Sequence, residues 1–155
     1  MKKLHIYVDT SVIGGCEDEE FSDISLRLWS RFCAGEFVLV ISDLTIQEIE
    51  TAPANVQRHL EEIPASHQMQ VNLGAEAEDL PNAYVAHGVV GPGSLANALH
   101  VALATVNDVD VLVSWNFKHI VNLGRIRLFN AVNLEQGYGL IEIRTPREVL
   151  HEEDV

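Results

Sequence analysis

The stretch NALHVALATVNDVDVLVSWNFKHIVN, residues 97–122, contains the two patterns that decide the fold. Its first half repeats apolar residues at helical spacing, which predicts a helix from Ser94 to about residue 107. Its second half contains DVLVS (110–114), a short and continuous apolar run of the kind that forms a strand covered on both faces. A helix that leads directly into a buried strand is typical of α/β folds.

The rest of the chain alternates in the same way between strand-like and helix-like segments. Short apolar runs predict further strands at LHIYV (4–8), FVLVI (37–41), LIEIR (140–144) and, at an edge of the sheet, MQVNL (69–73). Helical spacing predicts helices at residues 22–34, 44–52, 56–63, 75–90, 117–122 and 125–133. We therefore predict a three-layer α/β/α fold with a mainly parallel central sheet and residues 4–8 in its interior. Residues 1–148 are expected to form a single domain, followed by an acidic tail at 149–155.

Length and composition set further limits. A chain of 155 residues, 47% hydrophobic and 21% charged, has the size and balance of one globular domain rather than of a disordered segment. No apolar run approaches the roughly 18 residues that span a bilayer, and the first residues lack the apolar core of a signal peptide. We expect a cytoplasmic protein without a membrane segment. Cys16 and Cys33 lack metal-type spacing and are expected to be reduced thiols.

The sequence is strongly acidic, which bears on its partners. Its 23 acidic and 10 basic residues give a formal net charge of −13. Such a field repels nucleic acid at long range, so neither nonspecific duplex binding nor specific DNA binding by this chain alone is expected. A nuclease remains compatible with this charge because a bound divalent cation supplies local positive charge.

Four polar side chains are expected to meet at one edge of the sheet. In a parallel sheet, functional groups gather at the carboxyl ends of the strands. Asp9 and Asn116 directly follow strand-like runs. Glu48 lies one or two turns into the helix after another such run, and Asn97 begins the helix that leads into the strand at 110–114. We therefore expect these four side chains to converge.

Each of the four also has an ordinary structural explanation. Asp9 can cap a helix that begins near residue 11, because Asp is a good N-cap. Thr45 and Glu48 have the spacing of a capping box, in which both side chains satisfy backbone N–H groups at a helix start. Asn97 can be a polar residue of a first helical turn, and Asn116 a turn residue or a cap. Residue types alone leave both explanations open.

The four segments that carry these residues resemble the motifs of a known family. YVDTSVIGG (7–15), SDLTIQEIE (42–50), NALHVALAT (97–105) and VLVSWNFKHIVN (111–122) are similar, in this order, to the four motifs of PIN-domain proteins. The similarity covers the chain from Leu4 to about Ile143 and is greatest to the VapC-like ribonuclease toxins of type II toxin–antitoxin systems. It implies a nuclease that holds one or two Mg²⁺ or Mn²⁺ ions among carboxylates and cuts single-stranded RNA with a metal-activated water. It also implies an antitoxin protein and a homodimer as partners.

The resemblance assigns roles to the four converging residues. Asp9 matches the first acid of the family and Glu48 the second. Asn97 stands where the third motif usually opens with Asp, and Asn116 where Asp is common. Two carboxylates therefore remain of the usual four, so we expect a single, weak metal site held by Asp9, Glu48 and Asn97, because Mg²⁺ is often bound by only one or two carboxylates.

Four neighbouring residues are candidates for contact with the substrate, namely Thr10, His100, Lys118 and His119. A histidine hydrogen-bonded at the edge of the core is the alternative for His100. Lys118 and His119 form a basic cluster with Arg125 and Arg127, for which a helix-dipole or surface-pair role is the alternative. Two functions follow. One is a metal-dependent ribonuclease with a depleted acidic site, and the other is a catalytically impaired PIN domain that binds RNA or a protein.

Overall fold

The computed structural model describes residues 2–72 and 74–151, which form a sheet of five parallel strands in the order β3-β2-β1-β4-β5. The strands are β1 (His5–Val8), β2 (Val38–Ser42), β3 (Gln68–Val71), β4 (Val111–Val113) and β5 (Ile143–Arg144). The predicted parallel sheet is therefore present, with the strand predicted at 4–8 (β1) at its centre and the strand predicted at 69–73 (β3) at an edge. Leu73, at the end of the predicted edge strand, lies outside the described residues.

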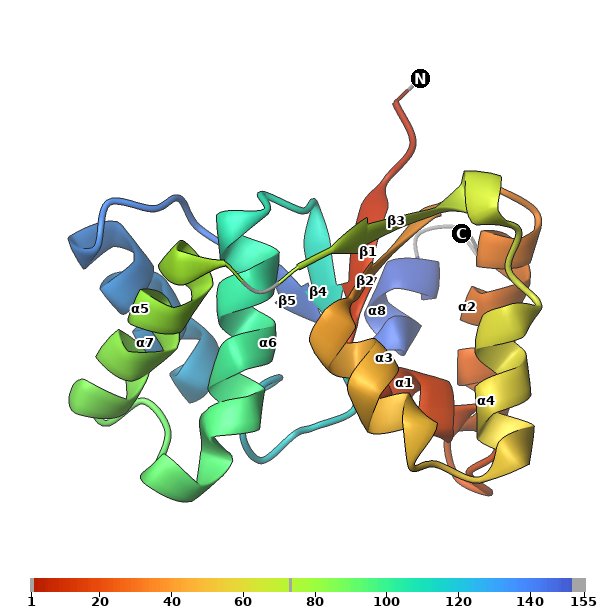
Figure 1. Ribbon diagram of the computed structural model, residues 1–155, viewed down its shortest axis with the longest axis horizontal. Coiled ribbons are helices and arrows are strands. Elements are labelled where there is room, and N and C mark those ends of the chain that lie inside the picture. Colours follow the sequence, from red (N-terminus) through yellow and green to blue (C-terminus); the bar gives the residue numbers. More distant parts are fainter. Residues whose placement is uncertain (1, 73, 152–155) are drawn as a thin grey trace.

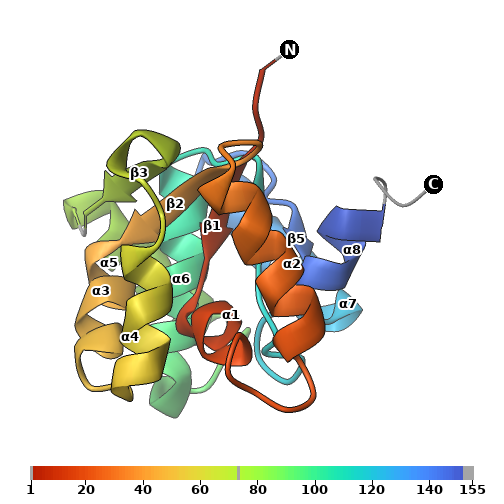
Figure 2. The same cartoon turned by 90° about the vertical axis from the view of Figure 1, so that its right-hand side faces the viewer.

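Helices cover both faces of this sheet. They are α1 (Thr10–Gly15), α2 (Ser22–Cys33), α3 (Asp43–Glu50), α4 (Ala54–Glu61), α5 (Ala75–Ala86), α6 (Leu95–Val106), α7 (Leu123–Glu135) and α8 (Pro146–His151), with short 3₁₀ turns at Ala65–His67 and Pro92–Ser94. Figure 1 shows α5, α6 and α7 on one side of the sheet and the other five helices on the opposite side. Figure 2 shows the molecule from the side of α1, α2 and α4. The three-layer α/β/α arrangement is confirmed.

The core consists of two apolar clusters, one on each face of the sheet. Side chains alternate between the faces of a strand, so Tyr7 of β1 joins the cluster that packs against α5, α6 and α7. Its neighbours Ile6 and Val8 join the cluster formed with α1, α2, α3, α4 and α8. These three residues of β1 are fully buried. A central strand covered on both faces has little freedom to shift, so the residue that follows it, Asp9, is held in a defined place.

The helix predicted at 117–122 is wrong. This segment forms a turn in which the N–H groups of Ile120 and Val121 both donate to the carbonyl oxygen of Asn116. Asn122 then takes extended backbone angles and caps α7, because its side chain accepts the N–H of Arg125. A residue in this N-cap conformation cannot continue a helix that precedes it, so one turn is all that forms.

Two other details concern the ends of elements. The acidic tail predicted from residue 149 begins inside α8, where Leu150 is buried against the cluster that includes α2. Residues 152–155 lie outside the described residues. None of the helices in the described part of the chain has both the length and the apolar character that a membrane crossing requires.

Gly15 of α1 packs closely against Ser25 and Trp115 and gives a test of this packing. A Cβ atom there would lie 2.6 Å from Ser25 Oγ and 2.9 Å from Trp115 Nε1, two buried groups that hydrogen-bond each other at 2.8 Å. Gly15→Ala should therefore lower the free energy of unfolding by about 1–3 kcal/mol, as overpacking does. Gly14, the preceding residue of α1, has open space around it, and Gly14→Ala should leave stability unchanged or raise it by up to about 1 kcal/mol. Urea denaturation of both variants measures the difference, and equal stability would contradict the close packing at Gly15.

Candidate functional site

Asp9 lies buried at the carboxyl end of the central strand. Its Oδ1 accepts a hydrogen bond from Ser11 Oγ and its Oδ2 accepts one from Ser114 Oγ, both at 2.6 Å. The side chain makes no cap hydrogen bond to α1, so helix capping does not account for it. The residue is 4% exposed, and burial raises the pKa of its carboxyl although nearby His100 and the two hydroxyl donors act in the opposite direction.

Glu48 has a different environment on α3. Ser42, rather than Thr45, is the N-cap of this helix, because the Ser42 hydroxyl accepts the N–H of Thr45 at 3.1 Å. The capping box of Thr45 and Glu48, the structural alternative for Glu48, does not form. Instead Glu48 Oε1 accepts hydrogen bonds from Thr10 Oγ1 at 2.7 Å and from His100 Nε2 at 2.8 Å. The bond to His100 holds the pKa of the Glu48 carboxyl below its usual value.

His100 lies between Glu48 and the core. Its Nδ1 lies 2.7 Å from the hydroxyl of Tyr7, which in turn lies 2.8 Å from Ser42 Oγ. The histidine is 2% exposed, so its ring can hold Glu48 in place but offers little surface to a substrate. These contacts are those of the alternative given for His100, a histidine hydrogen-bonded at the edge of the core. One of its partners, however, is Glu48, the second acid of the site.

The two amides contact each other. Asn116 Nδ2 donates to Asn97 Oδ1 at 3.2 Å. Asn116 Oδ1 accepts the N–H of His119 at 2.9 Å, so Asn116 also caps the turn that follows it. Its own N–H donates to Ser114 Oγ, the hydroxyl that binds Asp9. The amides are therefore turn and helix residues and, at the same time, part of the hydrogen-bonded group around Asp9.

These contacts bring all four predicted residues to one edge of the sheet. One group of hydrogen bonds connects Asp9 through Ser114 to Asn116 and from there to Asn97. A second group connects Thr10, the next residue after Asp9, to Glu48 and His100. Sequence reasoning did not single out Tyr7 or Ser11. For Ser11, the Asp-x-Ser spacing of local side-chain turns is a signal that could have identified it.

The composition of the site limits the metal that it could hold. In residues 2–72 and 74–151, no three His, Cys, Asp or Glu side chains converge in an arrangement that could hold a metal ion. The site instead offers the carboxylates of Asp9 and Glu48 beside two neutral amides. A buried carboxylate such as Asp9, whose hydrogen-bond donors are neutral hydroxyls, is unfavourable on its own, and a cation would offset that cost. Two carboxylates suffice for one Mg²⁺ that completes its shell with water and phosphate oxygens.

Of the four residues of the predicted basic cluster, Lys118 and Arg127 are exposed, and His119 and Arg125 are half-buried. Lys118 is exposed on the turn that follows Asn116. Arg125 is half-buried and its Nη1 donates to the carbonyl of Val89, so it belongs to the fold. His119 is half-buried, and its Nδ1 has no hydrogen-bond partner among the described residues. Lys118 is therefore the cation that lies nearest in sequence to the site and is open to solvent.

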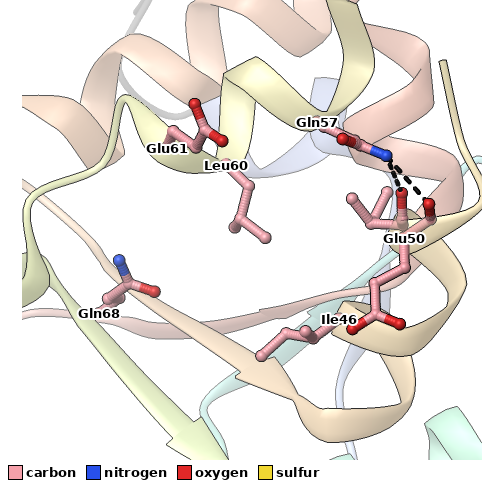
Figure 3. Close-up of a pocket in the computed structure, with 7 residues that line it drawn as sticks. Ile46, Glu50, Gln57, Leu60, Glu61 and Gln68 are labelled. Carbon is pink, nitrogen blue, oxygen red and sulfur yellow. Dashed lines mark hydrogen bonds between the residues drawn. The ribbon is translucent and has the colours of Figure 1, made fainter. Parts of the chain in front are cut away.

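A separate pocket of about 330 Å³ lies between α3, α4 and β3. Its lining, shown in Figure 3, consists of Ile46, Ile49, Glu50, Gln57, Leu60, Glu61 and Gln68. Gln57 Nε2 donates to the carbonyl oxygens of Ile49 and Glu50, and so supports the end of α3. None of the predicted site residues lines this pocket, so we do not assign it to the acidic site.

The opposite pKa shifts of the two acids make a test of the site's electrostatics. The pKa of Asp9 is raised in the folded protein, so stability is lost as pH rises through the interval from its unfolded to its folded value. Asp9→Asn should therefore melt higher than the wild type in EDTA at neutral pH, by on the order of 2–4 °C per kcal/mol, and lose this advantage at acidic pH. The pKa of Glu48 is lowered, so its stabilisation is present at neutral pH and lost in acid, and Glu48→Gln should melt lower at neutral pH. Melting curves with EDTA at several pH values measure both signs, and a shift of the same sign in the two variants would contradict the assignment.

Comparisons with known proteins identify the fold. No protein-family model matches the sequence, and no curated protein sequence is significantly similar to it. The crystal structure of Mycobacterium tuberculosis VapC20, a sarcin-ricin loop cleaving toxin, matches with a TM-score of 0.56 at 12% identity, over 74% of this chain and 92% of that one. The crystal structure of VapBC2 from Rickettsia felis, bound to a DNA fragment from their promoter, matches with a TM-score of 0.51 at 11% identity, over 92% of this chain and 98% of that one. At such identities the likeness concerns the fold alone. The parallel sheet flanked by helices is therefore a VapC-like PIN-domain fold, as the four motifs predict.

Proposed function

We propose that this chain is a divalent-metal-dependent endoribonuclease of the PIN-domain type that cuts single-stranded RNA. The observation that carries the proposal is the Asp9 carboxylate, buried at the carboxyl end of the central strand and hydrogen-bonded into one group with Asn97 and Asn116. A raised carboxyl pKa in such a place is characteristic of functional sites. The fold likeness to a toxin that cleaves the sarcin-ricin loop supports the same class of reaction.

Each residue of the site has a role in this proposal. The carboxylates of Asp9 and Glu48 and the amide oxygen of Asn97 would hold one Mg²⁺ or Mn²⁺. When bound, the ion supplies Lewis-acid polarisation of the phosphate and a lowered pKa for its water. Ser11 and Ser114 orient the Asp9 carboxylate through their hydroxyl hydrogen bonds.

The remaining site residues position the second acid and the substrate. Thr10 and His100 both donate to Oε1 of Glu48, which fixes the direction of its carboxylate. Asn116 holds Asn97 and the turn that bears Lys118. Lys118 is then available to an RNA phosphate, and His119 lies beside it.

The biological setting is part of the same proposal. We place the protein in the cytoplasm as a single PIN-like domain, the toxin of a toxin–antitoxin pair. Its antitoxin protein and a second copy of the chain would be its partners. One fold neighbour, VapBC2, is a complex of a toxin with its antitoxin, which supports a search for a small antitoxin encoded beside this chain.

One observation favours a different function. Asn97 and Asn116 hydrogen-bond each other, so this half of the site is neutral and satisfied without a cation. A domain that binds RNA or a protein without cutting would have such a site. The two functions differ in whether cleavage depends on the metal and on Asp9.

Cleavage of a mixed single-stranded RNA pool with Mn²⁺ tests the proposal. The wild type should cut it, and EDTA should stop the reaction. Asp9→Ala should be slower by at least roughly 10²-fold, because it lacks the carboxylate that would hold the metal ion and so position the attacking water. Glu50→Gln is the matched control, because Glu50 is an exposed acid of the same helix as Glu48 and should not alter the rate. RNA that the wild type binds but does not cut would exclude the nuclease and favour the binding domain.

Asn97→Asp adds a carboxylate without a change in size and tests the metal assignment. The added charge should tighten Mn²⁺ binding by roughly tenfold to a hundredfold, which corresponds to ~1.4–2.8 kcal/mol. In EDTA, Asn97→Asp should melt at a lower temperature than the wild type, because a third carboxylate beside Asp9 and Glu48 adds repulsion. Calorimetric titration with Mn²⁺ and melting curves in EDTA and Mn²⁺ measure the two effects. An Asn97→Asp variant with the wild-type melting temperature in both conditions would mean that Asn97 only begins a helix.

A further inference from the structure

Three aromatic side chains gather beside the acidic site. Phe21 stacks on Trp115 with ring centroids 4.4 Å apart and planes inclined by 20°. Phe117 lies 6.3 Å from Phe21 and 6.2 Å from Trp115. Trp115 is 8% exposed, but Phe117 is 51% exposed. In this cluster, Phe21 and Trp115 are therefore stacked on each other, and the ring of Phe117 reaches solvent.

This aromatic cluster is connected by a hydrogen bond to the residues around Asp9. The backbone N–H of Trp115 donates to Ser11 Oγ at 2.9 Å, and the same hydroxyl donates to Asp9 at 2.6 Å. Trp115 and Phe117 are the two sequence neighbours of Asn116. The exposed ring therefore lies on the same turn as one of the four residues of the candidate site.

The turn that presents Phe117 is braced on both sides. Asn122 Nδ2 donates to the carbonyl oxygens of Phe117 at 2.7 Å and of Lys118 at 3.1 Å. On the other side, Trp115 Nε1 donates to the buried Ser25 hydroxyl at 2.8 Å. Because the backbone that bears Phe117 is held in this way, little backbone freedom is lost when a flat partner stacks on the ring.

Phe117 differs from the other exposed apolar residues. In the described part of the chain the remaining large hydrophobic side chains with high exposure are aliphatic, namely Leu4, Leu26, Met69, Leu95, Leu123, Leu128, Leu134 and Leu140. An aromatic ring offers a π-face to a nucleobase, which an aliphatic side chain lacks. Its sequence neighbour Lys118 is exposed and places a positive charge beside the ring, as a base with its phosphate requires.

The net charge explains why stacking is needed. At −13 the chain as a whole repels RNA, so release of counterions by a broad basic surface cannot provide most of the affinity. Stacking on an aromatic ring is independent of charge and tolerant of sequence. We propose that Phe117 is a stacking platform for an unpaired base of single-stranded RNA, next to the phosphate that lies at the acidic site. This inference deepens the proposed function and rests on it.

Binding of a fluorescent RNA tests the platform. The probe is a pool of short single-stranded RNA in which 2-aminopurine replaces adenine, mixed with the full chain in Mn²⁺ and read before cleavage products accumulate. The wild type should quench the 2-aminopurine through stacking. Phe117→Leu should lose the quench and bind about tenfold more weakly, which corresponds to ~1.4 kcal/mol, and Phe117→Trp should restore both.

Two control variants separate stacking from other causes. Leu140→Ala removes a side chain that is 69% exposed on the segment before β5, at the amino ends of the strands, whereas Asp9 lies at their carboxyl ends, and it should leave binding unchanged. Lys118→Gln should weaken binding and reduce the slope of log affinity against log salt by about one, whereas Phe117→Leu should leave the slope unchanged. Melting curves of each variant show that the fold is kept.

The results that overturn the platform are distinct from those that overturn the nuclease. Equal affinity and equal quench in Phe117→Leu, while the wild type still cuts RNA, would remove the platform alone. Dissociation of a wild-type dimer in Phe117→Leu by sedimentation, with RNA binding intact, would assign the ring to contact between two copies of the chain. Quench and affinity that depend on Phe117 without any Mn²⁺-dependent cleavage would support the platform and remove the nuclease.

Discussion

The hydrogen bond from Ser114 to Asp9 is the contact on which the site depends. Parallel pairing places Val8 of β1 opposite Val113 of β4, so the next residues, Asp9 and Ser114, come to lie side by side. A shift of one residue between these strands would turn the two side chains to opposite faces of the sheet. The same Ser114 hydroxyl accepts the N–H of Asn116 and so positions the turn that follows. The geometry of the polar site is therefore set by the packing of the apolar strands beneath it.

The pKa values of the two acids of the site are shifted in opposite directions, and the neutral amides limit the repulsion on Asp9. Burial disfavours the charge of Asp9, while a hydrogen bond from His100 favours that of Glu48. Neutral side chains at Asn97 and Asn116 spare Asp9 the repulsion of further carboxylates and satisfy each other instead. In the proposed metal site, these amides would favour the stability of the fold over affinity for a cation. This balance is the kind of exchange between stability and activity that functional sites commonly show.

The sequence allowed most of the fold and part of the site to be predicted, for identifiable reasons. Continuous apolar runs identify buried strands, and the rule for strand ends then places Asp9 and Asn116 at one edge. The hydroxyl partners were not predictable in the same way, because the hydrogen bond between Tyr7 of β1 and His100 of α6, 93 residues apart, depends on how the helix packs on the sheet, which periodicity does not reveal. The helix expected at 117–122 failed because Asn122 caps the next helix. Local capping chemistry there overrides apolar spacing.

The position of Asp9 after the central strand couples ligand binding at this residue to the stability of the whole fold. β1 pairs with β2 on one side and with β4 on the other, and its side chains belong to both apolar clusters. The hydrogen bonds of β1 are therefore expected to break only in the global, cooperative unfolding of the sheet and not by local fraying. A ligand that binds the Asp9 carboxylate only in the folded state shifts that whole equilibrium by mass action. Global unfolding of this protein is thus a direct reporter of occupancy at its site, for any cation, nucleotide or partner that reaches Asp9.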